Sequence, residues 1–188
     1  MQDVTIDYIV RNTTSPINLE LPNIVRTGTW NLSVPVFNLN ISLIDPTWTL
    51  TGSQATLRER AFDLESFIYR VFSTKIYLTG NIPSSSATES NGSPSNVLGS
   101  SELTISNGAS GDFCTFTYQN RKDVLDREFA IFSGVTFLQL QFVAQNKVTV
   151  IPLIEETGYA CKIVDTSTNN TWLCSPITLT LKFTKIDN

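Results

Sequence analysis

The sequence predicts an all-β protein, a two-sheet sandwich of the jelly-roll type, and three observations lead to this fold class. Apolar and polar residues alternate with a period of two at both ends of the chain, which is the pattern of strands with one buried face. Further strand-like runs fill most of the remaining length. Hydrophobic residues make up 41% and charged residues only 16%, so a core can form under a surface rich in Ser, Thr and Asn. At 188 residues we expect a single β-sandwich domain over 1–188, because all-β domains of this length are commonly undivided.

The first and last strands are the most regular. The N-terminal strand, over 3–11, places four apolar side chains on one face: Val4, Ile6, Tyr8 and Val10. The C-terminal one does the same with Ile177, Leu179, Leu181 and Phe183. We therefore expect both to lie in a sheet, paired with each other or with a neighbouring subunit. The predicted strands are 3–11, 29–36, 37–44, 47–51, 67–79, 102–106, 112–119, 129–144, 147–154, 158–164 and 171–186.

The apolar parity changes near Pro35. Apolar residues occupy even positions from Trp30 to Val36 and odd positions from Phe37 to Leu43. A bulge or bend reverses the inward face in this way, and proline favours such a point because it cannot complete a sheet ladder. We expect a corner here that lets the chain pass between two packed sheets.

One short helix and one long loop interrupt the strands. Apolar residues at three- and four-residue steps, with capping-box spacing between Thr56 and Glu59, predict a helix over 56–66. The β-branched and aromatic residues that follow favour a strand from residue 67 onward. The segment 80–101 has few apolar residues and little charge, which predicts a long flexible loop.

A hairpin is expected near the C-terminus, with its turn at 165–170. If the turn is symmetric, Val164 faces Thr171 and Cys161 faces Cys174. Opposed residues of an antiparallel pair are close enough for a disulfide, so Cys161 and Cys174 are a candidate pair. The alternative is that both act as small hydrophobic residues. The third cysteine, Cys114, reads as a buried free thiol.

The sequence excludes much catalytic chemistry. The chain has no histidine, which removes Ser-His-Asp and Cys-His centres and His-ligated metal sites. No phosphate-binding loop or dinucleotide fingerprint is present. We expect no catalytic residues, no metal and no cofactor, and therefore no enzyme.

Charge and hydropathy restrict the partners. The net charge is −4 and no basic arm is present, so we expect no nucleic-acid binding. No apolar run is long enough for a transmembrane helix, so we expect no membrane insertion. The N-terminus lacks a signal-peptide pattern, which leaves a mature secreted fragment or a protein assembled inside a cell.

Three residues are candidates for contact with glycans. Asn12 and Asn169 lie in N-x-Ser/Thr sequons at a strand end and a hairpin tip, where a glycan could be attached. Trp172 flanks the hairpin turn and could be exposed enough to contact a ligand. The competing interpretation of Trp172 is packing in the core or across strands.

These observations favour a non-enzymatic structural or assembly protein. The first expectation is a virion component, such as a capsid, cement or spike subunit, that binds itself or other structural subunits. The second is a secreted pilin or adhesin in which residues 3–11 are donated to the next subunit, with Val4, Ile6, Tyr8 and Val10 as plugs. The third is a carbohydrate-binding β-sandwich module. The expected location is the virion, the extracellular space or the cell surface.

Overall fold

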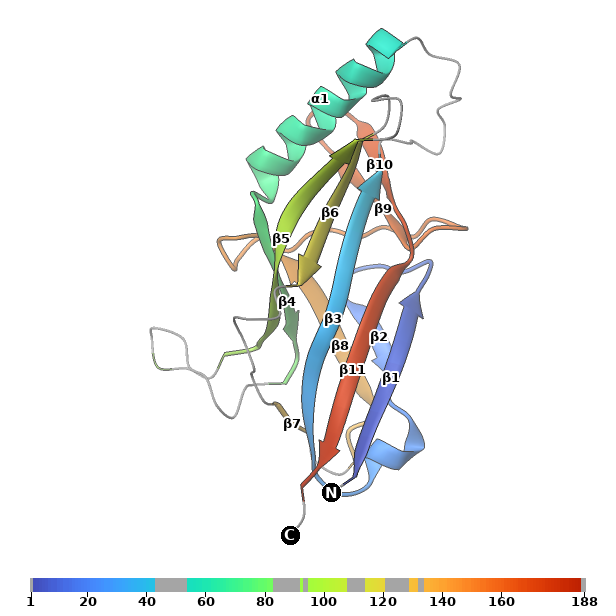
Figure 1. Ribbon diagram of the computed structural model, residues 1–188, viewed down its shortest axis with the longest axis vertical. Coiled ribbons are helices and arrows are strands. Elements are labelled where there is room, and N and C mark those ends of the chain that lie inside the picture. The colour runs from blue at the N-terminus through green and yellow to red at the C-terminus, as the bar shows by residue number, and fades with distance from the viewer. Residues whose placement is uncertain are drawn as a thin grey trace.

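The structure, a computed structural model, is mostly β and contains a single curled antiparallel sheet (Figure 1). It describes residues 2–42, 54–82, 92, 95–107, 114–120, 129–131 and 134–186. The prediction that the protein is all-β is confirmed. The strands are β1 (Asp3–Val10), β2 (Ile17–Glu20), β3 (Trp30–Ser42), β4 (Lys75–Gly80), β5 (Val97–Asn107), β6 (Cys114–Asn120), β7 (Phe129–Ile131), β8 (Phe137–Val143), β9 (Cys161–Asp165), β10 (Asn170–Cys174) and β11 (Ile177–Lys185). Two helical segments accompany them, the 3-10 turn η1 (Asn23–Arg26) and the helix α1 (Gln54–Val71).

The two end strands pair with each other. The order through the sheet is β1-β11-β3-β6-β5-β4-β8-β2, and β10 and β7 join at β3 while β9 joins at β10. β1 and β11 are antiparallel from the pair Asp3 and Thr184 to the pair Val10 and Ile177. Both ends of the chain therefore lie at the same end of the molecule (Figure 1). The sequence left open whether the end strands pair with each other or with a neighbouring subunit, and in the structure they pair with each other.

The predicted irregularity at Pro35 is confirmed, but it lies within one continuous strand. Thr180 of β11 pairs with Val36, and Lys182 pairs with Ser33, which leaves Val34 and Pro35 together opposite a single residue. The N-terminal half of β3 pairs with β11 and β7, and its C-terminal half pairs with β6 and β10. The prediction of two strands, 29–36 and 37–44, was wrong because the bulge absorbs the parity change without ending the strand. Residues 43 and 44 lie outside the described part.

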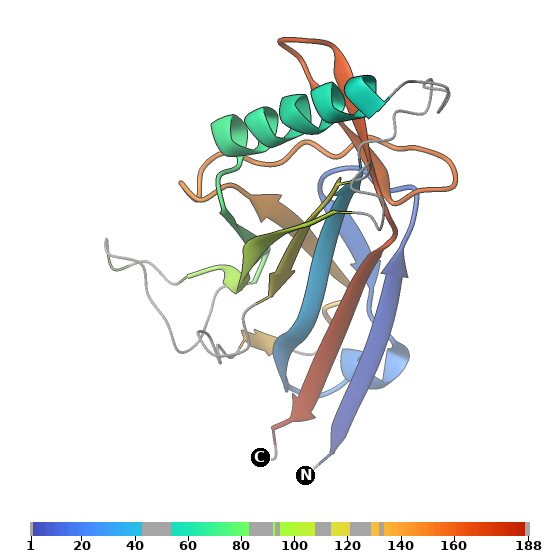
Figure 2. The same cartoon turned by 45° about the horizontal axis from the view of Figure 1, so that its top comes forward.

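The helix is longer than predicted. It continues through Val71 instead of ending near residue 66, and the strand that follows starts only at Lys75. Leu64, Phe67 and Ile68 are buried on one helix face, together with Phe72 just beyond its end. This packing outweighs the β propensity of the segment, which depends strongly on context. The helix lies across one end of the sheet (Figure 2).

The predicted loop over 80–101 ends earlier than expected. β5 begins at Val97, and its first residues pair with β4. The polar-looking segment enters the sheet because Val97 and Leu98 are buried and Gly99 has no side chain. A Cβ at Gly99 would lie 2.7 Å from the ring of Phe37, so only glycine fits there. Residues 83–91, 93 and 94 lie outside the described part.

The hairpin of β9 and β10 has the predicted register. Val164 faces Thr171, and Cys161 faces Cys174. Asp165 and Asn170 also pair, so the turn comprises residues 166–169. The prediction of longer strands at 129–144 and 147–154 was wrong. Residues 129–131 and 137–143 form separate strands, and within 147–154 only isolated bridges at Val150 and Ile154 occur.

Candidate interaction site at the free edge of β1

The described residues contain no group of three or more His, Cys, Asp and Glu side chains that could hold a metal ion. None of the described helices combines the length and apolar character needed to cross a membrane. Within the described part of the chain, four strands pair with only one other strand, namely β1, β2, β7 and β9, although Lys162 of β9 also bridges to Ile154 on its other side. Their lengths are 8, 4, 3 and 5 residues respectively. β1 is therefore the longest free edge, and it lies at one side of the molecule in both views (Figures 1 and 2).

The register of β1 shows which main-chain groups face away from the sheet. The amide of Lys185 donates to the carbonyl of Gln2 at 2.9 Å, so Gln2 and Lys185 form a hydrogen-bonded pair. Such pairs alternate along an antiparallel ladder, which assigns the even residues of β1 to bonding with β11. The N–H and C=O groups of Asp3, Thr5, Asp7 and Ile9 consequently point outward. We call these groups the β1 edge; within the described residues no hydrogen bond from them to a further strand is present.

The side chains of β1 obey the predicted alternation. Val10 is buried, while Val4, Ile6 and Tyr8 face the core but remain half-buried. Ile9 points to the other face and is 63% exposed. A strand inside a sheet would have its inward side chains covered by neighbours on both sides, whereas among the described strands β1 pairs with β11 alone. The free edge thus combines unpaired main-chain groups with apolar side chains that are incompletely covered.

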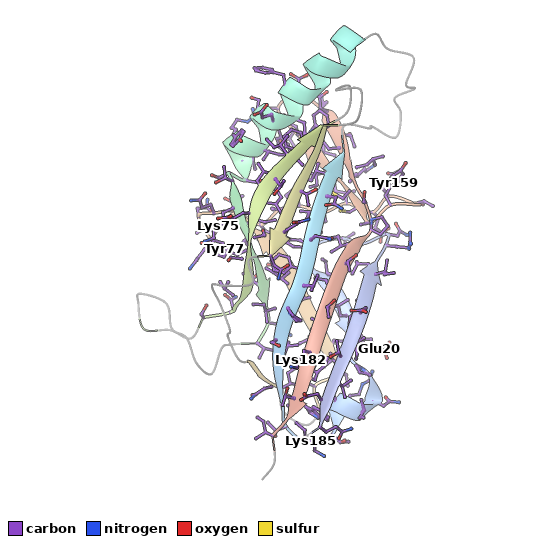
Figure 3. All side chains as sticks on the ribbon, viewed as in Figure 1. Glu20, Lys75, Tyr77, Tyr159, Lys182 and Lys185 are labelled. Carbon is purple, nitrogen blue, oxygen red and sulfur yellow. The ribbon has the colours of Figure 1, made fainter. Side chains whose placement is uncertain are left out.

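Tyr8 joins β1 to the other end of the sheet. Its hydroxyl donates to the main-chain carbonyl of Glu20 in β2 at 3.2 Å. Arg26 holds the Glu20 carboxylate at 2.9 Å and donates to the Leu21 carbonyl at 2.8 Å. Burial raises the pKa of Tyr8, so its hydroxyl keeps its proton and remains a donor across the neutral range. Figure 3 marks Glu20 beside β1 and Lys182 on the adjacent β11.

Two hollows flank Tyr8 between β1 and β2. The lower hollow, of about 410 Å³, is lined by Ile6, Tyr8, residues 20–23 and Arg26. The upper hollow, of about 350 Å³, is lined by residues 8–14 with Pro16, Asn18, Leu19 and Glu155. Alternate side chains of a strand laid along β1 would point toward these two hollows, because inward-facing residues recur every second position.

The side chains of β1 that point away from the core include the Asp7 carboxylate, which is directed toward β11. The hydroxyl of Thr180 donates to the Asp7 carboxylate at 2.7 Å. Thr5 lies opposite Lys182 in the same ladder. Charged side chains on a free edge discourage indiscriminate pairing, so a partner strand must suit this charge pattern.

The candidate glycan sites are accessible. Asn12 and Asn169 are both exposed, and both have left-handed backbones, with φ of 50° and 60°. Asn12 follows β1 directly and lines the upper hollow, whereas Asn169 is in the turn between β9 and β10. Their glycosylation stays a prediction.

The prediction that Trp172 contacts a ligand was wrong. Its side chain is 0% exposed and lies opposite Ile163 within the hairpin, as part of the hydrophobic core. The strand position next to the turn was correctly inferred, but α1 and the loop before β9 flank this hairpin, which the local sequence does not reveal. The competing interpretation, packing in the core, is correct.

Cys161 and Cys174 are directly opposite each other and fully buried, and both are free thiols in this structure. A hydrogen bond between the two sulfur groups, together with burial, raises the pKa of Cys174 well above its ordinary value. The Cys174 thiol therefore keeps its proton, and water has little access to either buried side chain.

We expect Cys161 and Cys174 to oxidise to a disulfide when the chain matures outside a reducing compartment. Thiols would be counted in material unfolded without reductant. One reactive thiol per chain, from Cys114, is the expected result, because the chain has three cysteines. Three reactive thiols in material from an oxidising environment would contradict the disulfide.

The sequence did not predict the cluster around Asp165. The carboxylate accepts hydrogen bonds from the Ser167 amide and hydroxyl at 3.1 and 2.7 Å, and from the Thr168 hydroxyl at 2.9 Å. Arg70 of α1 donates to it at 2.8 Å. Burial by itself would raise the pKa of Asp165, but these hydrogen bonds outweigh it and lower the pKa below its usual value. The D-x-S-T run at 165–168 is an Asx-type turn signal, yet nothing local identifies Arg70 as its partner.

The geometry of the Asp165 cluster indicates a role in stabilising the fold. Every oxygen of the carboxylate already accepts hydrogen bonds, and the ion pair fixes the end of α1 against the β9–β10 turn. A hollow of about 410 Å³ beside it is lined by Phe67, Phe72, Val150 and Pro152 among others. No further titratable group of the described residues lines this hollow.

Comparisons with known proteins found no matching family model, no matching curated protein and no matching solved structure.

Proposed function

We propose that this chain is a non-enzymatic structural subunit that assembles through contacts with its neighbours, and that the β1 edge is its main contact. The observation that carries the proposal is an eight-residue edge strand whose outward main-chain groups have no partner among the described residues and whose apolar row is half-covered. The setting that fits best is a virion component, such as a capsid, cement or spike subunit, located in the virion or on an extracellular surface.

Strand addition explains why both features occur in one place. An added strand supplies main-chain hydrogen bonds to Asp3, Thr5, Asp7 and Ile9, which gives affinity with little dependence on sequence. Its alternate side chains would enter the hollows beside Tyr8, and these give selectivity. The partners proposed are copies of the same chain or other structural subunits.

We further propose that the curled sheet acts as a two-layer sandwich of the jelly-roll type. The bulge at Pro35 supports this architecture, since the two halves of β3 pair with different groups of strands. Proline and a bulge at a strand midpoint are the usual means by which one strand contributes to two layers.

The proposal is tested by replacing Thr5 with proline. The Thr5 N–H points outward, so proline removes one main-chain donor of the β1 edge while all bonds to β11 remain. We expect native assemblies, measured by light scattering and electron microscopy, to be lost. The thermal midpoint of the monomer should stay within a few degrees of the wild type, since edge strands tolerate proline.

Two variants serve as controls. Thr5→Val keeps the main-chain donor and should assemble normally, whereas Ile6→Pro removes a bond to β11 and should lower stability. If Thr5→Pro assembles as well as the wild type, the β1 edge is not the contact and the proposal fails.

Deletion of residues 1–12 separates this proposal from strand donation to a neighbour. Within one subunit β1 covers β11 along eight residue pairs, so its removal should unfold or aggregate the chain. A donated strand would leave a soluble monomer that no longer polymerises. That second outcome would favour the pilin or adhesin interpretation.

A further inference from the structure

We propose that the strand added to β1 is β1 of a second copy of this chain, antiparallel, with the two-fold axis at Ile6. This inference rests on the proposed function, because it names the partner of the same contact surface.

A two-fold axis makes the pairing antiparallel and self-complementary. Only the odd residues of β1 present main-chain groups outward, so odd residues must pair with odd residues across the new contact. The axis therefore passes through a residue and not between two residues. The longest overlaps of Asp3–Val10 with itself have their axis at Ile6 or at Asp7.

Charge distinguishes these two registers. An axis at Asp7 places this carboxylate directly opposite its own copy, and like charges opposite each other are destabilising. An axis at Ile6 places Asp7 opposite Thr5 of the second copy and Asp3 opposite Ile9 of the second copy. No two like charges are then directly opposed, so the Ile6 register is favoured.

Apolar side chains also meet across the contact in this register. On the inward face Ile6 meets Ile6, and Val4 meets Tyr8, so the half-buried row of one chain covers that of the other. The second copy's Ile6 and Val4 lie opposite Ile6 and Tyr8, which both line the lower hollow. Burial of this apolar surface adds to the main-chain hydrogen bonds of the new ladder.

The register is tested by disulfide formation with Ile6→Cys. Ile6 would form a non-hydrogen-bonded pair with its copy, at about 4.5 Å between Cα atoms, a separation that a disulfide spans. We expect mild oxidation to give a covalent dimer on a non-reducing gel. Thr5→Cys should not cross-link to itself, but a mixture of Thr5→Cys and Asp7→Cys chains should. The wild type reports any background from the three native cysteines.

A pair of charge variants gives a second readout that needs no core-facing substitution. Ile9 is 63% exposed and faces Asp3 of the second copy in the Ile6 register. Ile9→Lys creates two opposite-charge pairs per dimer, whereas Ile9→Glu creates two like-charge pairs. The two attractive pairs alone are worth about 2- to 30-fold in affinity, so by analytical ultracentrifugation we expect Ile9→Lys to bind its copy more tightly than Ile9→Glu by at least this factor.

The outcomes separate this inference from the proposed function. Equal dimer affinity of the two Ile9 variants, or a Thr5→Cys chain that cross-links to itself faster than Ile6→Cys, overturns the Ile6 register. If Thr5→Pro abolishes native assemblies but Ile6→Cys never cross-links, a different chain binds the β1 edge. In that case the inference fails while the proposed function stands.

Discussion

Replacing Trp172 with alanine should lower the free energy of unfolding by about 3–5 kcal/mol. Its side chain is fully buried opposite Ile163, so truncation removes apolar contact and leaves a cavity in the core. Chemical denaturation monitored by circular dichroism would measure the loss. The effect is expected to be the largest of any single substitution proposed for this protein.

Trp172→Phe provides the matched control, because it keeps an aromatic ring in the same space and should cost less than half as much. If the Trp172→Ala chain were as stable as the wild type and had an altered affinity for a sugar, Trp172 would have to be exposed, which would contradict its burial in the structure. That result would also revive the interpretation of the chain as a carbohydrate-binding module through Trp172.

Replacing Asp165 with alanine should lower stability at neutral pH by about 2–3 kcal/mol. The carboxylate is buried, and its loss leaves the Ser167 amide, two hydroxyl groups and Arg70 without their acceptor. Asp3→Asn makes a charge-removing change at an exposed position of β1 and should alter stability by less than about 0.5 kcal/mol.

The Asp165 contribution should depend on pH in a definite direction. The pKa of Asp165 is lowered in the folded chain, so folding favours the ionised form. The stabilisation is complete above the unfolded pKa of about 3.9 and is lost as pH falls through the lower folded pKa. The stability difference between the wild type and Asp165→Asn should therefore shrink on acidification. A difference that is constant from neutral to acidic pH would contradict the geometry of the cluster.

The local sequence predicts that β1 is a strand, but it does not predict that β1 lies at the edge of the sheet. The alternation of Val4, Ile6 and Tyr8 predicted an N-terminal strand and its inward face, and both are confirmed. The sequence could not show that β1 ends the sheet on one side, because strand order depends on contacts between residues far apart in the chain. The β1 edge and its hollows follow from that order and from the position of β2.

The helix illustrates how packing overrides local preference. Residues 67–71 have the composition of a strand, but Phe67 and Ile68 continue the buried face that Leu64 begins. The same limit applies to Trp172, where the strand was inferred correctly and its burial was not. Asp165 and Arg70 are 95 residues apart, so their ion pair has no sequence signal at all.

The sequence by itself determined the β class, the bulge at Pro35, and the register that opposes Cys161 and Cys174. These features depend on backbone periodicity and turn length, which are encoded within a few neighbouring residues. The tertiary structure alone decided where α1 ends, which tryptophan is buried, and which strand keeps a free edge. Each of these depends on what lies across the fold, since burial and pairing are set by distant segments that a local pattern does not contain.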